Sequence, residues 1–458
     1  LLRQASRRHR GVPLAGDGRL IGKLKLPYTL TGAQRRVIEE IRGDMAQPVP
    51  MLRLLQGDVG SGKTLVALTA MLVAVEAGAQ AALLAPTEIL ARQHHATLLS
   101  QLDAVGVRVA ILTGREKGKA REAVLMGLAD GSIDILVGTH AIFQEKVAYK
   151  NLGLVVIDEQ HRFGVSQRLL LAAKAERPPH MLVMTATPIP RTLTLTQYGE
   201  MDVSRIDEMP PGRTPVETRV ISDEKLPQVI DGLGRHLATG GQAYWVCPLV
   251  EESDKIDSAA AEQRAALLRQ RFGERVGLVH GRMKGPEKDA VMGAFASGGL
   301  AVLVATTVVE VGVDVPNATL MVVEGADRFG LAQLHQLRGR VGRGEGQSIC
   351  LLVRGQSLSE TAHARLALMR ETNDGFRIAE EDLRLRGPGE ILGTKQSGDV
   401  GFRVATAEEV AELAPIAQSD AQLLLDRDGG LKGQRGQAAR TCLYLFERDQ
   451  AVGLIRSG

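Results

Sequence analysis

The chain has 458 residues, of which 44% are hydrophobic and 24% charged, and this composition excludes intrinsic disorder and a collagen-like repeat. At about 150 residues per domain, roughly three domains are expected. Charges interrupt every apolar stretch before the roughly 20 residues that a membrane-spanning helix needs, which excludes an integral membrane protein. Lys plus Arg total 56 against 53 Asp plus Glu, so a polyanionic partner must be argued from local clusters. Three widely spaced cysteines offer neither a disulfide framework nor a metal knuckle, and they indicate a reducing cytosol.

The first 25 residues form a basic segment, which we expect to be a linker. It contains no aromatic residue and no apolar stretch of signal-peptide length. Such a cluster is typical of a solvated surface, and contact with nucleic acid is the second interpretation. Its charged residues are Arg3, Arg7, Arg8, Arg10, Arg19, Lys23 and Lys25, against the single acid Asp17.

Residues 26–208 alternate short apolar runs with longer helical patterns. Runs rich in Val, Leu and Ile with helices between them are typical of βαβ units around a parallel sheet. We therefore expect a doubly wound α/β domain here. Its strands are expected at residues 51–55, 81–85, 107–112, 134–138, 154–158 and 181–185.

The sequence GDVGSGKT at residues 57–64 directly follows the first expected strand and opens an Ala- and Leu-rich helix. This is the P-loop pattern in its proper context. Its glycines let backbone N–H groups face an anion, Lys63 reaches the β- and γ-phosphates of ATP, and Thr64 holds Mg²⁺ through its hydroxyl. A plain Gly-rich turn explains neither the Lys-Thr pair nor the strand before it. The expected nucleotide contacts in this loop are Gly57, Asp58, Val59, Gly60, Ser61, Gly62, Lys63 and Thr64.

Two adjacent acids, Asp158 and Glu159, end the strand expected at residues 154–158. Open α/β sheets bind their ligands at the carboxyl ends of the strands. We expect Asp158 to hold the Mg²⁺ ion and Glu159 to polarise the attacking water. Alone, such acids are as often helix N-caps, but the P-loop favours the catalytic interpretation.

A second series of strands follows a turn-rich segment, MPPGRTPV at residues 209–216, which we interpret as an interdomain hinge. These strands are expected at residues 243–250, 276–280, 301–305, 319–323 and 348–353. We therefore predict a second α/β domain at residues 209–360. The strand pattern stops near residue 361, so residues 361–458 are expected to form a helical and loop-rich extension.

The tandem layout with a P-loop and a DEQH box resembles the superfamily 2 helicases, and this resemblance implies two RecA-like P-loop domains with parallel sheets. Residues 26–34 (LPYTLTGAQ) resemble the Q motif, in which Gln34 reads the adenine edge. Tyr28 either stacks on the base or packs in the core, and the sequence does not choose between these two roles. Residues 85–94 and 138–143 resemble motifs Ia and Ib on the strand-binding side, and Thr113-Gly114 resembles the TxG element. Residues 185–192 (TATPIPRT) resemble motif III, which implies that Thr185, Thr187 and the nearby His161 couple the nucleotide site to nucleic acid.

In the second domain, residues 305–319 resemble motif V and residues 333–344 contain the motif VI pattern QxxGRxGR, which begins at Gln336. Arg340 and Arg343 would act as arginine fingers, because phosphoryl transfer needs positive charge where negative charge develops. ATP would then lie between the two domains, and hydrolysis would let them reopen. A solvated basic surface is the alternative interpretation, but it leaves the flanking glycines and Gln336 unexplained.

The tail sequence DGFRIAEEDLRLRGPGEILGTKQSG at residues 374–398 resembles the translocation motif of the RecG family of branched-DNA helicases, which the transcription-repair coupling factor shares. DLRLRGPGE at residues 382–390 favours RecG, and the resemblance runs from about Gly18 to the last residue. It implies that Arg384 and Arg386 belong to a coupling loop that ends at Gln396.

The RecG resemblance also implies the cofactors ATP and Mg²⁺ and the partner, double-stranded and branched DNA such as forks and Holliday junctions. It further implies roles in recombination and repair, a monomer in the bacterial cytosol at the nucleoid, and contact with single-strand-binding protein. RecG proteins carry an N-terminal wedge domain that nothing in this sequence resembles, so we expect a motor fragment with weakened fork recognition.

Two other functions remain open at this stage. An RNA-dependent DExH ATPase shares most of these motifs, although the tail motif argues against it. A non-catalytic nucleic-acid scaffold is the third interpretation, and the presence of Lys63, Glu159, Arg340 and Arg343 argues against it.

Overall fold

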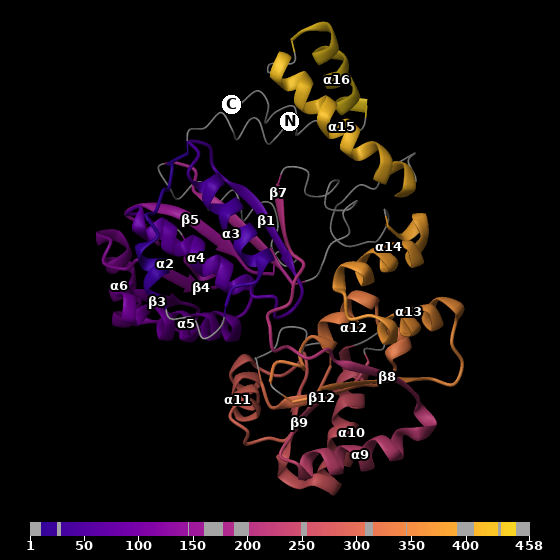
Figure 1. Ribbon diagram of the computed structural model, residues 1–458. Coiled ribbons are helices and arrows are strands. Elements are labelled where there is room, and N and C mark those ends of the chain that lie inside the picture. The colour runs from indigo at the N-terminus through magenta and orange to yellow at the C-terminus, as the bar shows by residue number, and fades with distance from the viewer. Residues whose placement is uncertain are drawn as a thin grey trace.

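The computed structural model consists of two α/β units, joined by a short connection, with a helical region after the second (Figure 1). It describes residues 11–24, 29–144, 146–159, 177–186, 201–248, 254–306, 315–344, 346–391, 407–428 and 432–445. The predicted fold class, two parallel-sheet α/β domains with a helical C-terminal region, is confirmed. The domain boundaries expected at residues 25, 208 and 360 stay predictions.

The first sheet has seven parallel strands in the order β3-β4-β2-β5-β6-β1-β7. Three of its central strands, β2, β4 and β5, are buried along their whole length, in keeping with their apolar sequences. Helix α4 (Lys63–Glu76) is also buried from Leu65 to Ala74, because sheet and helices enclose it. The strands are β1 (Leu52–Gly57), β2 (Gln80–Leu84), β3 (Val109–Leu112), β4 (Ile135–Gly138), β5 (Leu152–Ile157), β6 (His180–Thr185) and β7 (Asp202–Ile206).

The second sheet has six parallel strands in the order β10-β11-β9-β12-β13-β8. The strands are β8 (Glu217–Ser222), β9 (Gln242–Val246), β10 (Val276–Val279), β11 (Val302–Ala305), β12 (Ala318–Val323) and β13 (Ile349–Arg354). Strands β7 and β8 were not predicted. Both are edge strands whose sequences, DVSRI and ETRVIS, mix charged and polar residues with apolar ones, so the continuous apolar run that marks the central strands is missing.

The two sheets share a structural device at their second strand in sequence, which supports their common plan. Gln80 and Gln242 each begin such a strand and are each 5% exposed. The Nε2 of Gln80 donates to the carbonyls of Leu128 and Ile133 at 3.1 and 2.8 Å. The Nε2 of Gln242 donates to those of Phe295 and Leu300, both at 2.7 Å. In each case one side chain ties a helix that comes later in the chain, α6 or α11, and the loop after that helix to the start of the strand.

Residues 11–24, expected to lie in a basic linker, pack against the first sheet's helices. Leu14 is 2% exposed and belongs to the first domain's core. The carboxylate of Glu76 accepts the N–H groups of Gly18 and Leu20 at 2.9 and 2.5 Å, next to α2 (Arg19–Lys23). This part of the basic segment is therefore an integral support of α4.

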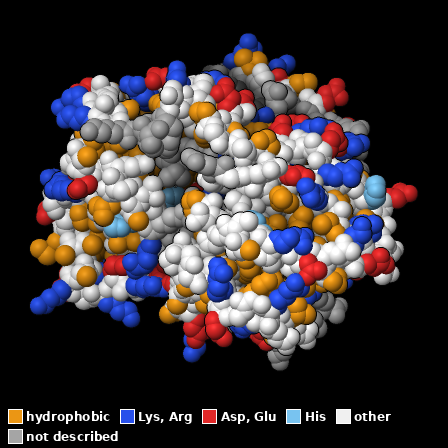
Figure 2. Space-filling model, turned by 60° about the horizontal axis from the view of Figure 1, so that its bottom comes forward, with side chains coloured by type: hydrophobic (Ala, Val, Ile, Leu, Met, Phe, Trp, Pro, Cys, Tyr) orange, Lys and Arg blue, Asp and Glu red, His pale blue; other side chains and the backbone are white. Residues whose placement is uncertain are grey.

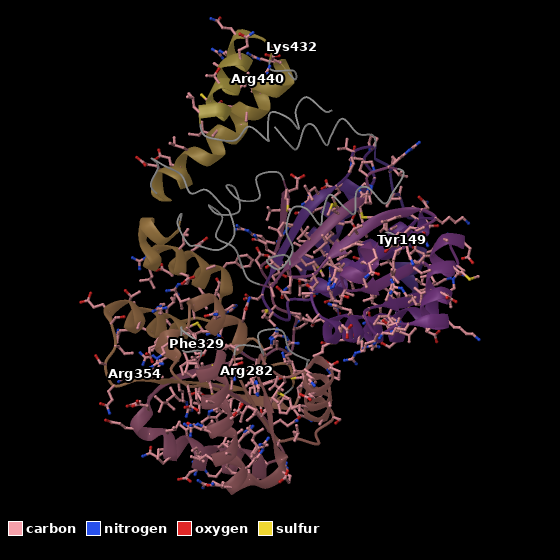
Figure 3. All side chains as sticks on the ribbon, turned by 180° about the vertical axis from the view of Figure 1, so that it is seen from behind. Tyr149, Arg282, Phe329, Arg354, Lys432 and Arg440 are labelled. Carbon is pink, nitrogen blue, oxygen red and sulfur yellow. The ribbon has the colours of Figure 1, made fainter. Side chains whose placement is uncertain are left out.

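The remaining helices cover the sheets and extend the second unit. In the first unit these are α3 (Gly32–Met45), α5 (Glu88–Leu102) and α6 (Gly118–Asp130), and in the second α9 (Leu226–Ala238), α10 (Asp254–Phe272), α11 (Gly285–Ala296) and α12 (Leu331–Arg338). Helices α13 (Glu360–Glu371) and α14 (Gly375–Ile391) pack on α12, and α15 (Ala407–Arg427) and α16 (Gln434–Leu445) lie beyond them (Figure 1). Lys432 and Arg440 mark this outlying pair, remote from both sheets (Figure 3).

The surface carries both charge signs. On the side drawn in Figure 2, Lys and Arg side chains are interspersed with Asp and Glu side chains over both units. None of the helices in the described part of the chain is long and apolar enough to cross a membrane.

Candidate nucleotide site between the two sheets

The P-loop has the strand-to-turn-to-helix form that its sequence predicts. Strand β1 ends at Gly57 and α4 begins at Lys63. Gly60 and Gly62 have φ angles of 81° and 91°, a region that L side chains rarely adopt. Gly57 is required for space instead, because a Cβ there would lie 2.5 Å from the Oγ of Ser61. The loop therefore places the N-terminus of a 14-residue helix at the carboxyl edge of the sheet.

The Lys63 ammonium lies inside the loop. Its Nζ donates to the carbonyls of Gly57 and Asp58 at 2.6 and 2.8 Å, and the residue is 9% exposed. Burial lowers the pKa of Lys63 to about 8, against the opposing charges of Glu159 and Asp158. Among the described residues, the hydrogen bonds of this buried cation go to backbone carbonyls, which a phosphate can replace as the acceptor.

The two acids follow β5 directly, as predicted. Burial opposes ionisation of Asp158, but the hydrogen bond from His94 and the charge of Lys63 outweigh it and lower the pKa. The pKa of Glu159 is raised, first by burial and then by the neighbouring Asp158. Glu159 has a φ of 53° and is the only non-glycine residue with a positive φ in the described ranges. Such strain is often found at functional sites.

His94 is a site residue that the sequence analysis missed. It lies on α5, within the segment that resembles motif Ia, and its Nε2 is 2.8 Å from the Oδ2 of Asp158. Both side chains are largely buried, at 11% and 14% exposed. The pair joins the acidic end of β5 to a helix expected on the nucleic-acid side.

Gln34 lies beside the P-loop, where the Q-motif resemblance places it. Its Oε1 accepts the N–H of Thr31 at 3.0 Å, closing a capping box at the start of α3. Its Nε2 donates to the carbonyl of Ser61 at 2.8 Å. The residue is 1% exposed and both ends of its amide are hydrogen-bonded within the domain, so its contact with an adenine edge stays a prediction.

The second sheet's contribution comes from the turn after α12. The charge of Arg340 partly offsets the burial that raises the pKa of Glu159, and the charge of Arg343 adds to the burial that lowers the pKa of Lys63. Both electrostatic effects act between residues of different domains. Lys63, Asp158 and Glu159 lie at the carboxyl edge of the first sheet, and Arg340 and Arg343 follow α12 in the turn whose Gly339 packs against Val59 of the P-loop. The catalytic roles of these five residues stay predictions.

The hinge and the second domain also touch the P-loop directly. Arg213 donates to the carbonyl of Val59 at 2.5 Å and to that of Gly339 at 3.5 Å. A Cβ on Gly339 would lie 2.8 Å from the Cβ of Val59, so the turn after α12 needs a glycine to approach this closely. A cavity of about 370 Å³ opens beside this contact, bordered among others by Asp58, Val59, Arg213, His335, Arg338 and Phe376.

His335 and Arg338, on α12, were not predicted either. His335 Nε2 is 2.7 Å from the Oδ1 of Asp58 in the P-loop. Arg338 is 2% exposed and donates to the carbonyls of Met369 and Thr372, both at 2.8 Å. The motif VI resemblance assigned roles to Arg340 and Arg343, which follow α12, but none to Arg338, the arginine within this helix.

Some of the predicted coupling residues lie within the described part of the chain and others do not. Thr185 ends β6 and is 3% exposed, and Gln336 is half-buried on α12. Arg384 and Arg386 were expected in a coupling loop, but both positions lie within helix α14. Arg384 is exposed there and donates to Glu381 at 2.8 Å in a surface ion pair. Tyr28, His161, Thr187 and Gln396 lie outside the described residues, as do the side chain of Arg386 and most of the motif V segment.

Three family models match the chain in succession. Residues 31–196 match the DEAD/DEAH box helicase model, and residues 224–345 match the helicase conserved C-terminal domain. Residues 372–437 match domain 3, C-terminal, of the ATP-dependent DNA helicase RecG.

Curated relatives bear the name given in the third family model, ATP-dependent DNA helicase RecG. The chain is 52% identical over 433 residues to the ATP-dependent DNA helicase RecG of Escherichia coli (strain K12), covering 93% of this chain and 62% of that protein. It is 53% identical over 405 residues to the Bacillus subtilis (strain 168) protein of that name, covering 88% and 59%. The chain thus spans about three fifths of the length of these relatives.

Two solved structures of helicases also match the chain. A structure of RecG bound to a three-way DNA junction matches with a TM-score of 0.77 and 44% identity, over 91% of this chain and 54% of that one. The Saccharomyces cerevisiae Dbp5 structure with RNA and ADP BeF3 matches at TM-score 0.53 over 85% of this chain and 97% of that one; at 15% identity, it supports the fold alone. The three consecutive family matches, the identity to the curated relatives and the paired sheets with their shared site establish that the chain belongs to the RecG family of ATP-dependent DNA helicases.

Proposed function

We propose that this chain is an ATP-driven motor that translocates along duplex DNA and acts on branched DNA, in the manner of RecG. The observation that carries the proposal is the contact of the second domain with the P-loop, where His335 Nε2 lies 2.7 Å from the Oδ1 of Asp58 and Gly339 packs against Val59. A site completed by two domains makes hydrolysis depend on their closure, and closure is the motion that a translocase needs.

Within this site, the P-loop amides and Lys63 bind the ATP phosphates, and Gln34 reads the adenine. The Lys63 ammonium exchanges its bonds to the Gly57 and Asp58 carbonyls for phosphate oxygens. Glu159 orients and deprotonates the attacking water, and its raised pKa suits a base. Arg340 and Arg343 stabilise the charge that develops on the transferred phosphoryl group.

Thr64 and Asp158 would hold Mg²⁺. A hydroxyl and an ionised carboxylate are the oxygen ligands that this ion prefers, and the lowered pKa of Asp158 keeps it ionised. Mg²⁺ in nucleotide sites is commonly held by one or two protein ligands together with phosphate and water. When bound, Mg²⁺ neutralises charge on the phosphates.

The coupling to DNA involves Thr185, Thr187, His161 and Gln336 near the nucleotide, and Arg384, Arg386 and Gln396 in the tail. Double-stranded and branched DNA are the proposed partners, because the relatives are DNA helicases and one related structure is bound to a three-way junction. Action as a monomer in the bacterial cytosol, at the nucleoid, and contact with single-strand-binding protein remain predictions of the family resemblance.

The direct test is steady-state ATP hydrolysis by the whole chain with linear duplex, a model fork or RNA added. We expect duplex DNA to stimulate hydrolysis and Lys63→Ala to abolish it. Lys119→Ala is a matched control, because Lys119 is exposed on α6 and outside the site. Stimulation by RNA but not by duplex DNA would replace the proposal with an RNA-dependent ATPase, and nucleotide binding without turnover would replace it with a scaffold.

A further inference from the structure

The side chain of Asp58 connects the P-loop to the second domain. Its Oδ1 lies 2.7 Å from the Nε2 of His335 on α12, and its Oδ2 accepts the N–H of Gly375 at 3.1 Å. Gly375 is the first residue of α14. One carboxylate in the phosphate loop therefore holds two elements of the other domain, including the start of the helix that leads into the tail.

The ring of His335 has a defined protonation pattern. Arg338 Nη2 is 3.0 Å from the Nδ1 of His335, and a guanidinium can only donate. Nδ1 is therefore the acceptor, and Nε2 carries the hydrogen that is donated to Asp58. Because Arg338 also donates to the carbonyls of Met369 and Thr372 at the end of α13, the chain of contacts runs from the P-loop through α12 to the α13–α14 junction.

The packing at this point is specific to glycine at position 375. A Cβ there would lie 1.9 Å from the Oδ1 of Asp58 and 2.5 Å from the Nε2 of His335. Asp58 and His335 are themselves largely buried, with side chains 13% and 7% exposed. A buried carboxylate at the N-terminus of a long helix is also favoured by the helix dipole.

Phosphate in the loop would act on this arrangement in two ways. The carbonyl of Asp58 is one of the two acceptors of Lys63 Nζ, so a phosphate that recruits Lys63 removes one backbone hydrogen bond of the residue whose side chain holds α14. The phosphate also brings negative charge close to the Asp58 carboxylate, and like charges in a buried site repel. The contacts of Asp58 thus compete with occupancy of the loop.

We propose that His335 is a positioning residue that joins the P-loop to α14, so that nucleotide in the P-loop loosens the first turn of α14 and thereby reaches the DNA-engaging tail. The proposal rests on the proposed function, since it assumes that the P-loop binds nucleotide. It assigns a role to Asp58, His335 and Gly375 beyond phosphate binding and the arginine fingers.

The test is hydrogen exchange of the full chain with and without Mg²⁺ and a non-hydrolysable ATP analogue. In the wild type we expect α4 to become protected and the first turn of α14 to exchange about tenfold faster, within the usual range of coupling between sites. In His335→Leu, α4 should still become protected when the analogue binds. The first turn of α14 should exchange fast both with and without the analogue. His335→Gln, which can donate to Asp58 and accept from Arg338, should restore the response.

Two further variants keep the test independent of folding defects. Gly375→Ala should abolish the α14 response, whereas Gly293→Ala, on α11 with nothing near its Cβ position, should not. His363→Leu, exposed on α13, is the matched control for His335. An α14 that fails to respond, or exchanges more slowly, while α4 is protected would overturn the inference, and so would an equal response in His335→Leu. Absence of α4 protection in the wild type would instead refute nucleotide binding, and with it the proposed function.

Discussion

The buried ion pair between Arg264 and Glu324 allows a quantitative prediction for the second domain. The Glu324 carboxylate accepts hydrogen bonds from the Nε and Nη2 of Arg264 at 2.6 and 2.9 Å, and one from the indole of Trp245. The two charged side chains are 17% and 18% exposed, and Trp245 is fully buried. Glu324→Leu leaves the guanidinium and the indole N–H without this acceptor, so the free energy of unfolding should fall by about 3 kcal/mol.

The assay uses the fluorescence of Trp245, which is the only tryptophan of the chain and reports on this domain. With a urea dependence of about 2 kcal/mol per molar, the unfolding midpoint should fall by about 1.5 M. Arg271→Met, which breaks an exposed pair with Asp231, should cost about 1 kcal/mol at most. The double variant Glu324→Leu with Arg264→Met should be more stable than either single variant, because no buried charge is then left unpaired. Additive losses in the double variant would refute this reasoning.

Three further predictions concern the nucleotide site and its support. Arg340→Ala and Arg343→Ala should each lower kcat for ATP hydrolysis about a thousandfold, while the affinity for ADP stays near that of the wild type. Steady-state hydrolysis measures the first quantity and titration with a fluorescent nucleotide the second. An unchanged kcat would contradict the role of these residues as arginine fingers. His94→Ala should raise the Mg²⁺ concentration for half-maximal hydrolysis about tenfold or more, because Asp158 loses its orienting hydrogen bond; the same Mg²⁺ dependence in both proteins would dismiss this role. Burial lowers the pKa of His180, so the unfolded chain takes up a proton below about pH 6.5 while the folded ring is still neutral. Between pH 6.5 and the lower pKa of the folded ring, the free energy of unfolding should therefore fall by up to about 1.4 kcal/mol per pH unit. Unfolding followed by circular dichroism should show that this acid dependence is smaller in His180→Gln, and an equal dependence would be evidence against it.

The parts of the site that the sequence predicted are those in which local chemistry dictates residue type. A phosphate loop needs glycines at positions of positive φ, which Gly60 and Gly62 supply, and a lysine at the helix start. Strands buried on both faces are recognisable from continuous apolar runs, and so the order of domains followed from the sequence.

The parts that the sequence did not predict depend on contacts between distant segments. His94 and Asp158 are 64 positions apart, and Asp58 and His335 are 277 positions apart. A single histidine on a helix carries no periodic signal that marks such a partner. The packing of Leu14 in the first core was hidden for a related reason, because the surrounding arginines and lysines made the segment resemble a solvated linker.

The most direct test of the central claim is a translocation assay on linear duplex DNA, in which a third strand bound as a triplex is displaced by a motor that moves along the duplex. The account predicts that this chain displaces the third strand only with ATP and Mg²⁺, and that Lys63→Ala and Arg340→Ala do not displace it. Stimulation of hydrolysis by duplex DNA without any displacement would contradict the claim that the two domains convert ATP hydrolysis into movement.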